Sequence, residues 1–148
     1  MSSVLRNKAL QHLARRDHAR GELRQKLLPF TEDSSEVDAV LDDFVERGWL
    51  SDTRFAEQWV FYRSARYGPQ RLRAELQQKG VASDIISAVM EEHGDDELAQ
   101  ARALWRKRFG SPPQDPKEKN KQLRFLISRG FSVSVIYKVV GGTEDDDF

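Results

Sequence analysis

The chain has 148 residues, enough for one domain of ordinary size with a modest core. Hydrophobic residues make up 39 % and charged residues 32 %, and the eight Phe, three Trp and three Tyr argue against full disorder. The absence of cysteine excludes disulfides and thiolate metal sites. The sequence contains neither an apolar run long enough for a transmembrane helix nor a signal peptide, so we expect a cytoplasmic protein with no membrane partner.

Apolar residues recur at helical spacing along most of the chain. Val37, Val40 and Leu41 follow the i, i+3, i+4 rule, and strict alternation over the length of a strand is nearly absent. Gly48 and the Gly68-Pro69 pair are typical of helix ends and starts. We predict helices at residues 4–16, 19–28, 34–47, 52–66, 69–79, 82–92, 95–109, 117–129 and 132–140.

The stretch VSVIYKVV, residues 133–140, is β-branched and by propensity could be a strand. An internal repeat favours a helix instead. At an offset near 50, QQKGVASDIISAVM (77–90) aligns with ISRGFSVSVIYKVV (127–140), and the earlier segment has clear helical spacing. The predicted fold class is therefore all-α, with three tandem three-helix repeats that form an elongated, curved modular body. The predicted repeats are residues 4–50, 51–94 and 95–140, followed by an acidic tail, 141–148, that we expect to be disordered.

No catalytic motif is present: the chain lacks HExxH, GxSxG, a glycine-rich phosphate loop and a cysteine nucleophile. The acidic run EEHGDDE, residues 91–97, could offer carboxylates to a divalent cation, but it lacks the spacing of an EF-hand loop. Helix capping explains it better, with Asp95 or Asp96 at the start of the next helix. We therefore expect no enzyme activity, no catalytic residues, no metal and no cofactor.

The formal net charge is zero, but blocks of opposite charge alternate along the chain. The basic blocks are residues 1–30, 54–83 and 98–143. Binding responds to local patches rather than to the total charge, so nucleic acid remains a candidate partner. The alternative is that neighbouring helices neutralise each other.

The middle basic block contains RSARYGPQRLRAELQQKG, residues 63–80. Arg63 and Arg66 lie near the end of a predicted helix, where their side chains could stabilise the helix dipole or meet phosphates. Arg71 and Lys79 each lie four residues from Glu75 and could pair with it. The third block places Phe125 four residues from both Lys121 and Arg129, as in a stacking site or in a wide core face. The candidate partner- or DNA-binding residues are Arg63, Arg66, Tyr67, Arg71, Arg73, Lys79, Arg106, Lys107, Arg108, Lys121, Arg124 and Arg129.

The segment RGWLSDTRFAEQWVFYRSARYGPQRLRAELQQKGV, residues 47–81, resembles the core signature of the RecX family, bacterial regulators of the RecA recombinase. The opening ALQHLARRDHARGELRQKL and the ending RFLISRGFSVSVIYKVV resemble the same family, with Ala19 a small departure. The matching positions in the core are Gly48, Leu50, Asp52, Arg54, Phe55, Ala56, Arg63, Gly68, Leu72, Leu76, Gly80 and Val81.

The resemblance implies a modular helical protein whose partner is the RecA filament on single-stranded DNA. Such a protein would lower RecA ATPase, strand exchange and co-protease activity in recombination, DNA repair and the SOS response. It would touch the DNA directly or through RecA, and we expect it to be a monomer. The alternative is a stand-alone DNA-binding protein built from helix-turn-helix-like units. Against this alternative, the short middle helices show no repeated set of base-reading residues.

Overall fold

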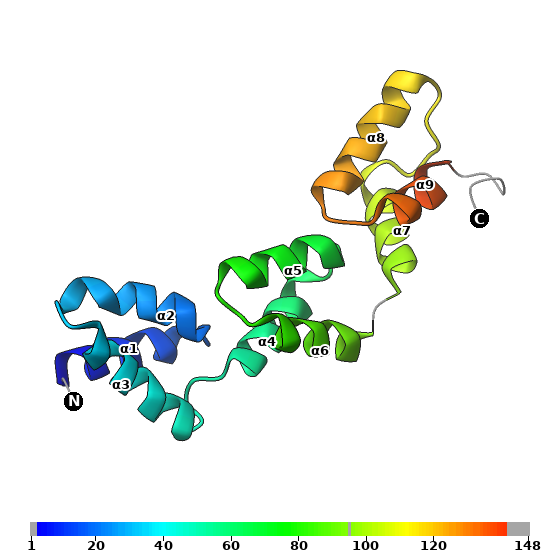
Figure 1. Cartoon of the computed structure of the whole chain (residues 1–148). Helices are drawn as coiled ribbons and strands as arrows, with labels where there is room; N and C mark the ends of the chain where they lie inside the picture. The colour runs from blue at the N-terminus through cyan, green and yellow to red at the C-terminus, as the bar shows by residue number, and fades with distance from the viewer. Residues whose placement is uncertain (1–2, 95, 142–148) are drawn as a thin grey trace. The chain divides into compact units, whose positions relative to one another are not determined.

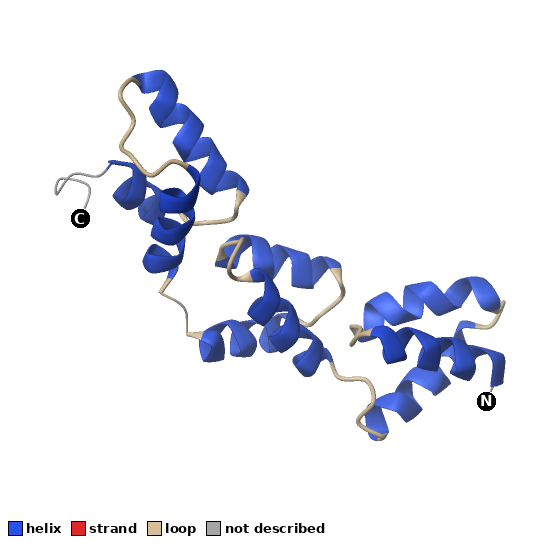
Figure 2. Ribbon diagram, turned by 180° about the vertical axis from the view of Figure 1, so that it is seen from behind, coloured by secondary structure: helices blue, strands red, loops and turns tan. Residues whose placement is uncertain are grey.

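A computed structural model describes residues 3–94 and 96–141 of the chain. These residues form nine α-helices and one short 3-10 helix joined by loops, and contain no strand (Figures 1 and 2). None of these helices combines the length and apolar character that a transmembrane span requires. The elements are α1 Ser3–Arg15, α2 Arg20–Leu27, η1 Leu28–Phe30, α3 Ser34–Glu46, α4 Asp52–Arg63, α5 Pro69–Gln78, α6 Ser83–His93, α7 Glu97–Arg108, α8 Pro116–Ser128 and α9 Val133–Gly141.

The all-α prediction is confirmed, including the helix over the β-branched segment, now α9. Two details differ. The helix predicted to reach residue 66 ends at Arg63, because the N–H groups of Arg66 and Tyr67 both bond the carbonyl of Arg63 and form a turn. The predicted tail lies outside the described residues from 142 onward, and the elongated body stays a prediction.

In α1 and α4 some apolar residues are exposed while near neighbours are buried. Leu10 of α1 is 38 % exposed, whereas Leu5 and Ala9 are buried. Tyr62 of α4 is 75 % exposed, whereas Val60 is buried. Successive helical residues point about 100° apart, so a shift of one position moves a side chain from the core to the solvent.

The chain divides into two compact units. The first unit is Met1–Gln58 with Leu76–Val89, and the second is Trp59–Glu75 with Met90–Phe148. The divisions therefore fall inside α4, α5 and α6, within the predicted middle repeat.

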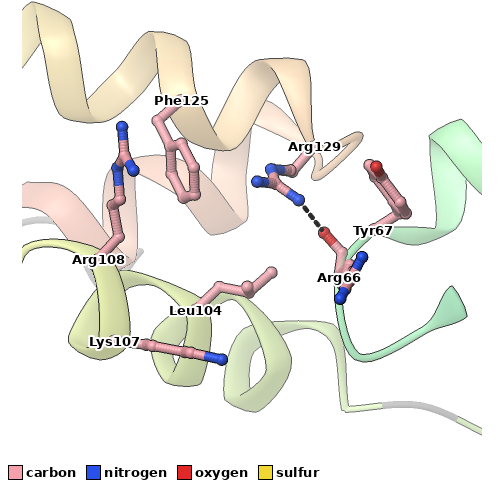
Figure 3. A pocket seen from close by; sticks show the side chains of 7 residues that line it. All are labelled: Arg66, Tyr67, Leu104, Lys107, Arg108, Phe125 and Arg129. Carbon is pink, nitrogen blue, oxygen red and sulfur yellow. Dashed lines mark hydrogen bonds between the residues drawn. The ribbon is translucent and has the colours of Figure 1, made fainter.

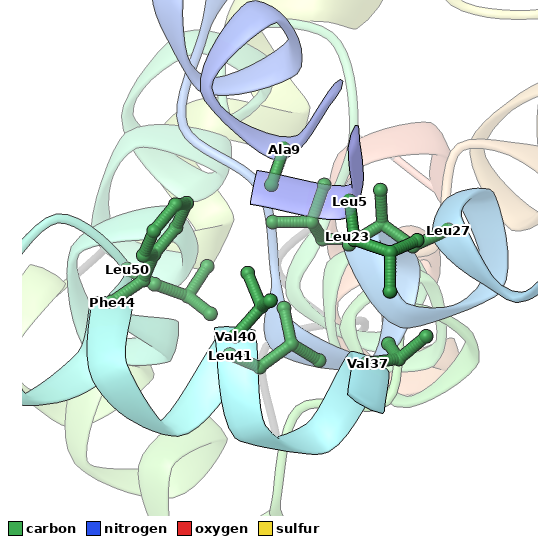
Figure 4. Close-up of a cluster of buried hydrophobic side chains, with 9 residues drawn as sticks. All are labelled: Leu5, Ala9, Leu23, Leu27, Val37, Val40, Leu41, Phe44 and Leu50. Carbon is green, nitrogen blue, oxygen red and sulfur yellow. The ribbon is translucent and has the colours of Figure 1, made fainter. Parts of the chain in front are cut away.

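In the first unit, α1, α2 and α3 pack against one another around an apolar core (Figure 4). Full burial of a Leu, Val or Phe side chain stabilises a fold by roughly 1.5–3 kcal/mol. This core is therefore the main source of stability in the bundle. Its buried members are Leu5, Ala9, Leu23, Leu27, Val37, Val40, Leu41, Phe44 and Leu50.

In the second unit, α7, α8 and α9 form a similar bundle around Ala101, Leu126 and Ile136. Gln122 is buried beneath the loop between α7 and α8. Its Oε1 accepts a hydrogen bond from Trp105 Nε1 at 2.8 Å, and its Nε2 donates to the carbonyl of Ser111 at 3.2 Å. A buried amide with both ends bonded costs little, so Gln122 ties the loop to the bundle.

The start of α5 lies against the turn between α8 and α9, inside the second unit. The amide of Gly68 donates to the carbonyl of Arg129 at 2.6 Å, and that of Gln70 donates to Gly130 O at 3.1 Å. The first N–H groups of a helix have no partner within the helix, so the turn caps α5. A Cβ on Gly68 would lie 2.6 Å from Gly130 O, and one on Gly130 would lie 2.6 Å from Arg71 N. Gly68 is thus required by close approach, not by the helix-ending role that its sequence position suggested.

A related contact joins the start of α2 to the turn between α5 and α6, inside the first unit. A Cβ on Gly21 would lie 3.1 Å from the carbonyl of Lys79 and 3.4 Å from Gly80 Cα. Lys79 Nζ also donates to Glu22 Oε2 at 3.0 Å. Lys79-Gly80 aligns with Arg129-Gly130 in the internal repeat, so two equivalent turns make two equivalent junctions.

Replacement of Gly68 by Ala tests the junction between the start of α5 and the turn at Arg129-Gly130. The new methyl group would meet Gly130 O and the ring of Phe131 at 2.6 and 2.7 Å. We expect a loss of roughly 1–3 kcal/mol in the free energy of unfolding, measured in urea. Gly21→Ala is the control, because its looser contact and better helix propensity should leave stability nearly unchanged. Equal unfolding midpoints for Gly68→Ala and the wild type would contradict this steric account.

Glu22 makes the junction between α2 and the turn at Lys79-Gly80 sensitive to acid. Burial raises the pKa of its carboxyl, but hydrogen bonds from Arg16 and Lys79 outweigh burial and lower the pKa from its ordinary value of 4.5 to about 2. A lowered carboxyl pKa gives stability that is present above pH 4.5 and lost as the pH falls towards 2. The shift corresponds to at most roughly 3 kcal/mol.

The test compares urea unfolding of the wild type and Glu22→Gln across this pH range. The gap between their unfolding free energies should shrink as the pH falls from 4.5 towards 2. Glu46→Gln, which removes the same charge from an exposed position of α3, is the control. A constant gap for Glu22→Gln would mean that the carboxylate does not hold the junction.

Candidate functional site

The turn between α4 and α5 gathers three guanidinium groups around one aromatic ring. The Cζ atoms of Arg63, Arg71 and Arg129 lie 4.5, 4.0 and 5.3 Å from the centroid of the Tyr67 ring. Arg63 also lies 5.0 Å from the ring of Trp59. A ring face attracts cations at these distances, so Tyr67 organises the turn. Of these five residues, the sequence placed all but Trp59 among the candidates.

Glu75 forms ion pairs with two of these cations. Arg63 donates to both Glu75 oxygens at 2.8 and 2.7 Å, and Arg71 donates to Oε2 at 3.3 Å. Trp59 Nε1 adds a third donor at 2.9 Å. Burial raises the pKa of Glu75, but the hydrogen bonds from Arg63 and Trp59 outweigh it and hold the pKa below its ordinary value. The pair between Glu75 and Arg71 is confirmed, and the bond to Arg63 was missed because it joins two helices.

Arg129 lies between two aromatic rings and has no carboxylate partner among the described residues. Its Cζ lies 5.0 Å from the ring of Phe125 as well as 5.3 Å from that of Tyr67. One of its nitrogens donates to the carbonyl of Arg66 at 3.4 Å (Figure 3). A guanidinium carries five N–H donors, so most of those on Arg129 remain available to a ligand.

These side chains border an open pocket of about 400 Å³, which we call the basic pocket (Figure 3). No acidic residue within 3–94 and 96–141 lines it, and no described carboxylate pairs with its arginines and lysine. Phe125 packs edge-on against Phe109 at 5.4 Å, with Arg108 Cζ 5.3 Å from its ring. The lining residues are Arg66, Tyr67, Leu104, Lys107, Arg108, Phe125 and Arg129.

The basic pocket suits an anion attached to a flat or apolar group. Arginine forks bind phosphate and carboxylate oxygens through paired hydrogen bonds. Exposed aromatic edges beside cations accept nucleobases by stacking. Phe125 lines the pocket and also packs against the core of the α7–α9 bundle, so its position is compatible with both roles that the sequence left open.

The remaining candidate residues lie outside the pocket. Lys79, which the sequence places four residues from Glu75, belongs to the first unit and donates to Glu22 Oε2 at 3.0 Å. Arg73 is exposed on α5, and no carboxylate partner for it lies among the described residues. Arg106, Lys121 and Arg124 are exposed on α7 and α8. Leu104 is the lining residue that sequence reasoning missed, because helical spacing marked it only as core.

The acidic run before α7 has structural roles. Asp96 caps α7 by accepting from the amide of Ala99 at 3.1 Å, and Glu97 Oε1 accepts from the amide of Ser132 at 2.7 Å. Asp95 lies outside the described residues. Within 3–94 and 96–141, no group of three or more His, Asp or Glu side chains is placed to hold a metal ion.

The nine α-helices of the described residues and the repeated helix–turn junctions define an all-α helical-repeat protein. Family models for the three RecX three-helix domains match residues 6–44, 51–90 and 95–140. The chain belongs to the RecX family of regulatory proteins, which is not a family of enzymes.

Several relatives resemble the chain over nearly its whole length, and each carries the name regulatory protein RecX. The protein from Ralstonia pickettii is 44 % identical over 141 residues, with 95 % of this chain and 89 % of the relative covered. The Chromobacterium violaceum protein is 43 % identical over 144 residues, covering 97 % and 93 %. The Pseudomonas fluorescens protein is 39 % identical over 146 residues, covering 97 % and 94 %.

The fold is also that of solved structures. The crystal structure of RecX from Lactobacillus salivarius matches with a TM-score of 0.79 at 20 % identity, covering 95 % of this chain and 94 % of that one. A second crystal structure, of a regulatory protein RecX, matches with a TM-score of 0.81 at 20 % identity, covering 95 % and 73 %.

Glu75→Gln tests whether the ion pairs of Glu75 with Arg63 and Arg71 stabilise the fold. The neutral amide keeps the shape but removes the charge that Arg63 and Arg71 share, so we expect a loss of roughly 1–3 kcal/mol in unfolding free energy. Glu57→Gln changes the same charge at an exposed position of α4 and should stay within about 0.5 kcal/mol of the wild type. Urea unfolding followed by circular dichroism measures both. If the two variants are equally stable, Glu75 does not hold the turn.

Proposed function

We propose that this protein regulates the RecA recombinase by binding the RecA filament on single-stranded DNA. It mainly inhibits RecA ATPase, strand exchange and co-protease activity, and so acts in recombination, DNA repair and SOS control. The observation that carries the proposal is membership of the RecX family over all three helical domains. The protein works in the cytoplasm as a monomer, with repeats at 4–50, 51–94 and 95–140, a division that the matched domain ranges support.

The basic pocket supplies a physical means of binding. A RecA filament on DNA presents phosphates and acidic side chains, and both are anions that Arg66, Lys107, Arg108 and Arg129 can bind. Since these four cations have no carboxylate partner among the described residues, an incoming anion does not have to displace a carboxylate. Arg63 and Arg71, by contrast, would have to leave Glu75 first. We therefore assign contact with the filament to the basic pocket, and a supporting role to Arg63, Arg71 and Glu75.

The surrounding basic residues extend this surface. Arg73 on α5, Arg106 on α7, and Lys121 and Arg124 on α8 are exposed. Their contribution is long-range attraction that speeds association and is screened by salt. Lys79 contributes through the junction with Glu22 rather than as a free cation.

The double variant Arg108→Gln, Arg129→Gln tests the assignment through inhibition of RecA ATPase on single-stranded DNA. Loss of two charge-assisted contacts should raise the concentration for half-inhibition by about tenfold or more. The control is Arg24→Gln, Arg47→Gln, which removes the same charge from residues paired with Asp38 and Asp43. Circular dichroism and urea unfolding check that each variant folds.

Two outcomes would count against the proposal. If the pocket variant and the control inhibit equally well while both are folded, the pocket does not meet the filament. If the wild type binds bare duplex DNA tightly at physiological salt and RecA adds nothing, the protein is a stand-alone DNA-binding protein, as in the alternative that the sequence left open.

A further inference from the structure

Most basic residues of the first unit have a carboxylate partner. Arg16 bonds Glu22, and Arg54 bonds Asp17, each at 2.9 Å. No described carboxylate pairs with Lys8, Arg15 or Lys26. The other ion pairs of this unit are Arg6–Asp43, Arg20–Asp42, Arg24–Asp38, Arg47–Asp43 and Lys79–Glu22.

Lys8, Arg15 and Lys26 form one group together with His12. Lys8, His12 and Arg15 occupy positions i, i+4 and i+7 of α1, so they share one face of the helix. Lys26 joins them from α2: its Nζ lies 2.9 Å from Nε2 of His18, and the ring of His18 lies 5.6 Å from that of His12. We call Lys8, His12, Arg15 and Lys26 the α1 strip.

His18 supports the strip without adding charge to it. It is 2 % exposed, and its Nδ1 lies 3.1 Å from the carbonyl of Arg16, which can only accept. Nδ1 therefore carries the proton, and Nε2 accepts from the ammonium of Lys26. The pKa of His18 is lowered, mainly by burial, so the ring is neutral near pH 7. His18 thus orients Lys26 but leaves its positive charge uncompensated.

The strip has an excess of positive potential. Burial lowers the pKa of His12, and repulsion from Lys26, Arg15, Arg16 and Lys8 lowers it further. Lys26 also has a lowered pKa, first from burial and then from Arg16. The carboxylate that reaches this region is Glu22, and it already accepts hydrogen bonds from Arg16 and Lys79. A further anion would relieve the repulsion.

An exposed aromatic ring continues the strip. Phe30 of η1 is 51 % exposed, and Lys8 Nζ lies 4.0 Å from its ring centroid. An acidic peptide needs only the cations, whereas a nucleic acid uses cations for its phosphates and exposed rings for its bases. The combination favours a single-stranded nucleic acid.

We propose that the α1 strip and Phe30 form a second binding site, which takes the phosphates of single-stranded nucleic acid and gains one proton at His12 when they bind. This site is separate from the basic pocket and goes beyond the regulation of RecA. A bound phosphate would stabilise the imidazolium of His12. Affinity should therefore rise as the pH falls below about 7, and level off once His12 is protonated in the free protein.

The experiment measures binding of a fluorescein-labelled oligothymidylate to the full chain by anisotropy, without RecA. Lys8→Gln, Arg15→Gln should weaken binding about tenfold and lower the slope of log affinity against log salt by about 1–2. The control Arg24→Gln, Arg47→Gln removes the same charge away from the strip. His12→Gln should abolish the rise in affinity at lower pH, and His93→Gln, the matched histidine control, should keep it.

The proposal fails if the strip variant binds like the charge control, or if His12→Gln keeps the full pH dependence. It also fails if oligoglutamate competes for the strip as well as unlabelled oligothymidylate does, since the site would then fit an acidic protein segment. Because no RecA is present, failure here leaves the proposed regulation of RecA to its own test. Circular dichroism of each variant confirms that the helices are intact.

Discussion

The backbone contact between Gly68 and the turn at Arg129-Gly130 positions the basic site of the second unit. Two amides at the start of α5 bond the carbonyls of that turn, at 2.6 and 3.1 Å, and neither glycine leaves room for a Cβ. This contact brings Tyr67 within reach of Arg129, and Arg129 in turn reaches Phe125. The pocket thus depends on two positions that carry no side chain.

Electrostatic pairing then divides the basic residues into two kinds. Glu75 and Glu22 each accept from two cations, and those cations hold the turns in place. The arginines and lysine of the pocket have no such partner among the described residues, so they present their donors to a ligand. A net charge of zero is therefore compatible with strong local positive potential. The chain belongs to a family of regulatory proteins, and we propose that this surface binds the RecA filament.

The helices could be predicted from the sequence because their signals are local. Apolar spacing marks α3, the Gly68-Pro69 pair marks the start of α5, and the repeat identifies α9 as a helix despite its β-branched residues. Pairing could not be predicted where it joins distant residues. Lys79 lies four positions from Glu75 yet bonds Glu22, because the junction brings α2 to the turn after α5. Sequence reasoning named most of the pocket residues but not which of them would remain uncompensated.

The central claim is that the basic pocket contacts the filament. Electron microscopy of this protein bound to RecA on single-stranded DNA, at a resolution that places helices and large side chains, tests it most directly. We expect the face formed by Tyr67, Phe125, Arg108 and Arg129 to lie against RecA or its DNA, with an anionic group in the pocket. A bound complex in which this face points to solvent would contradict the account.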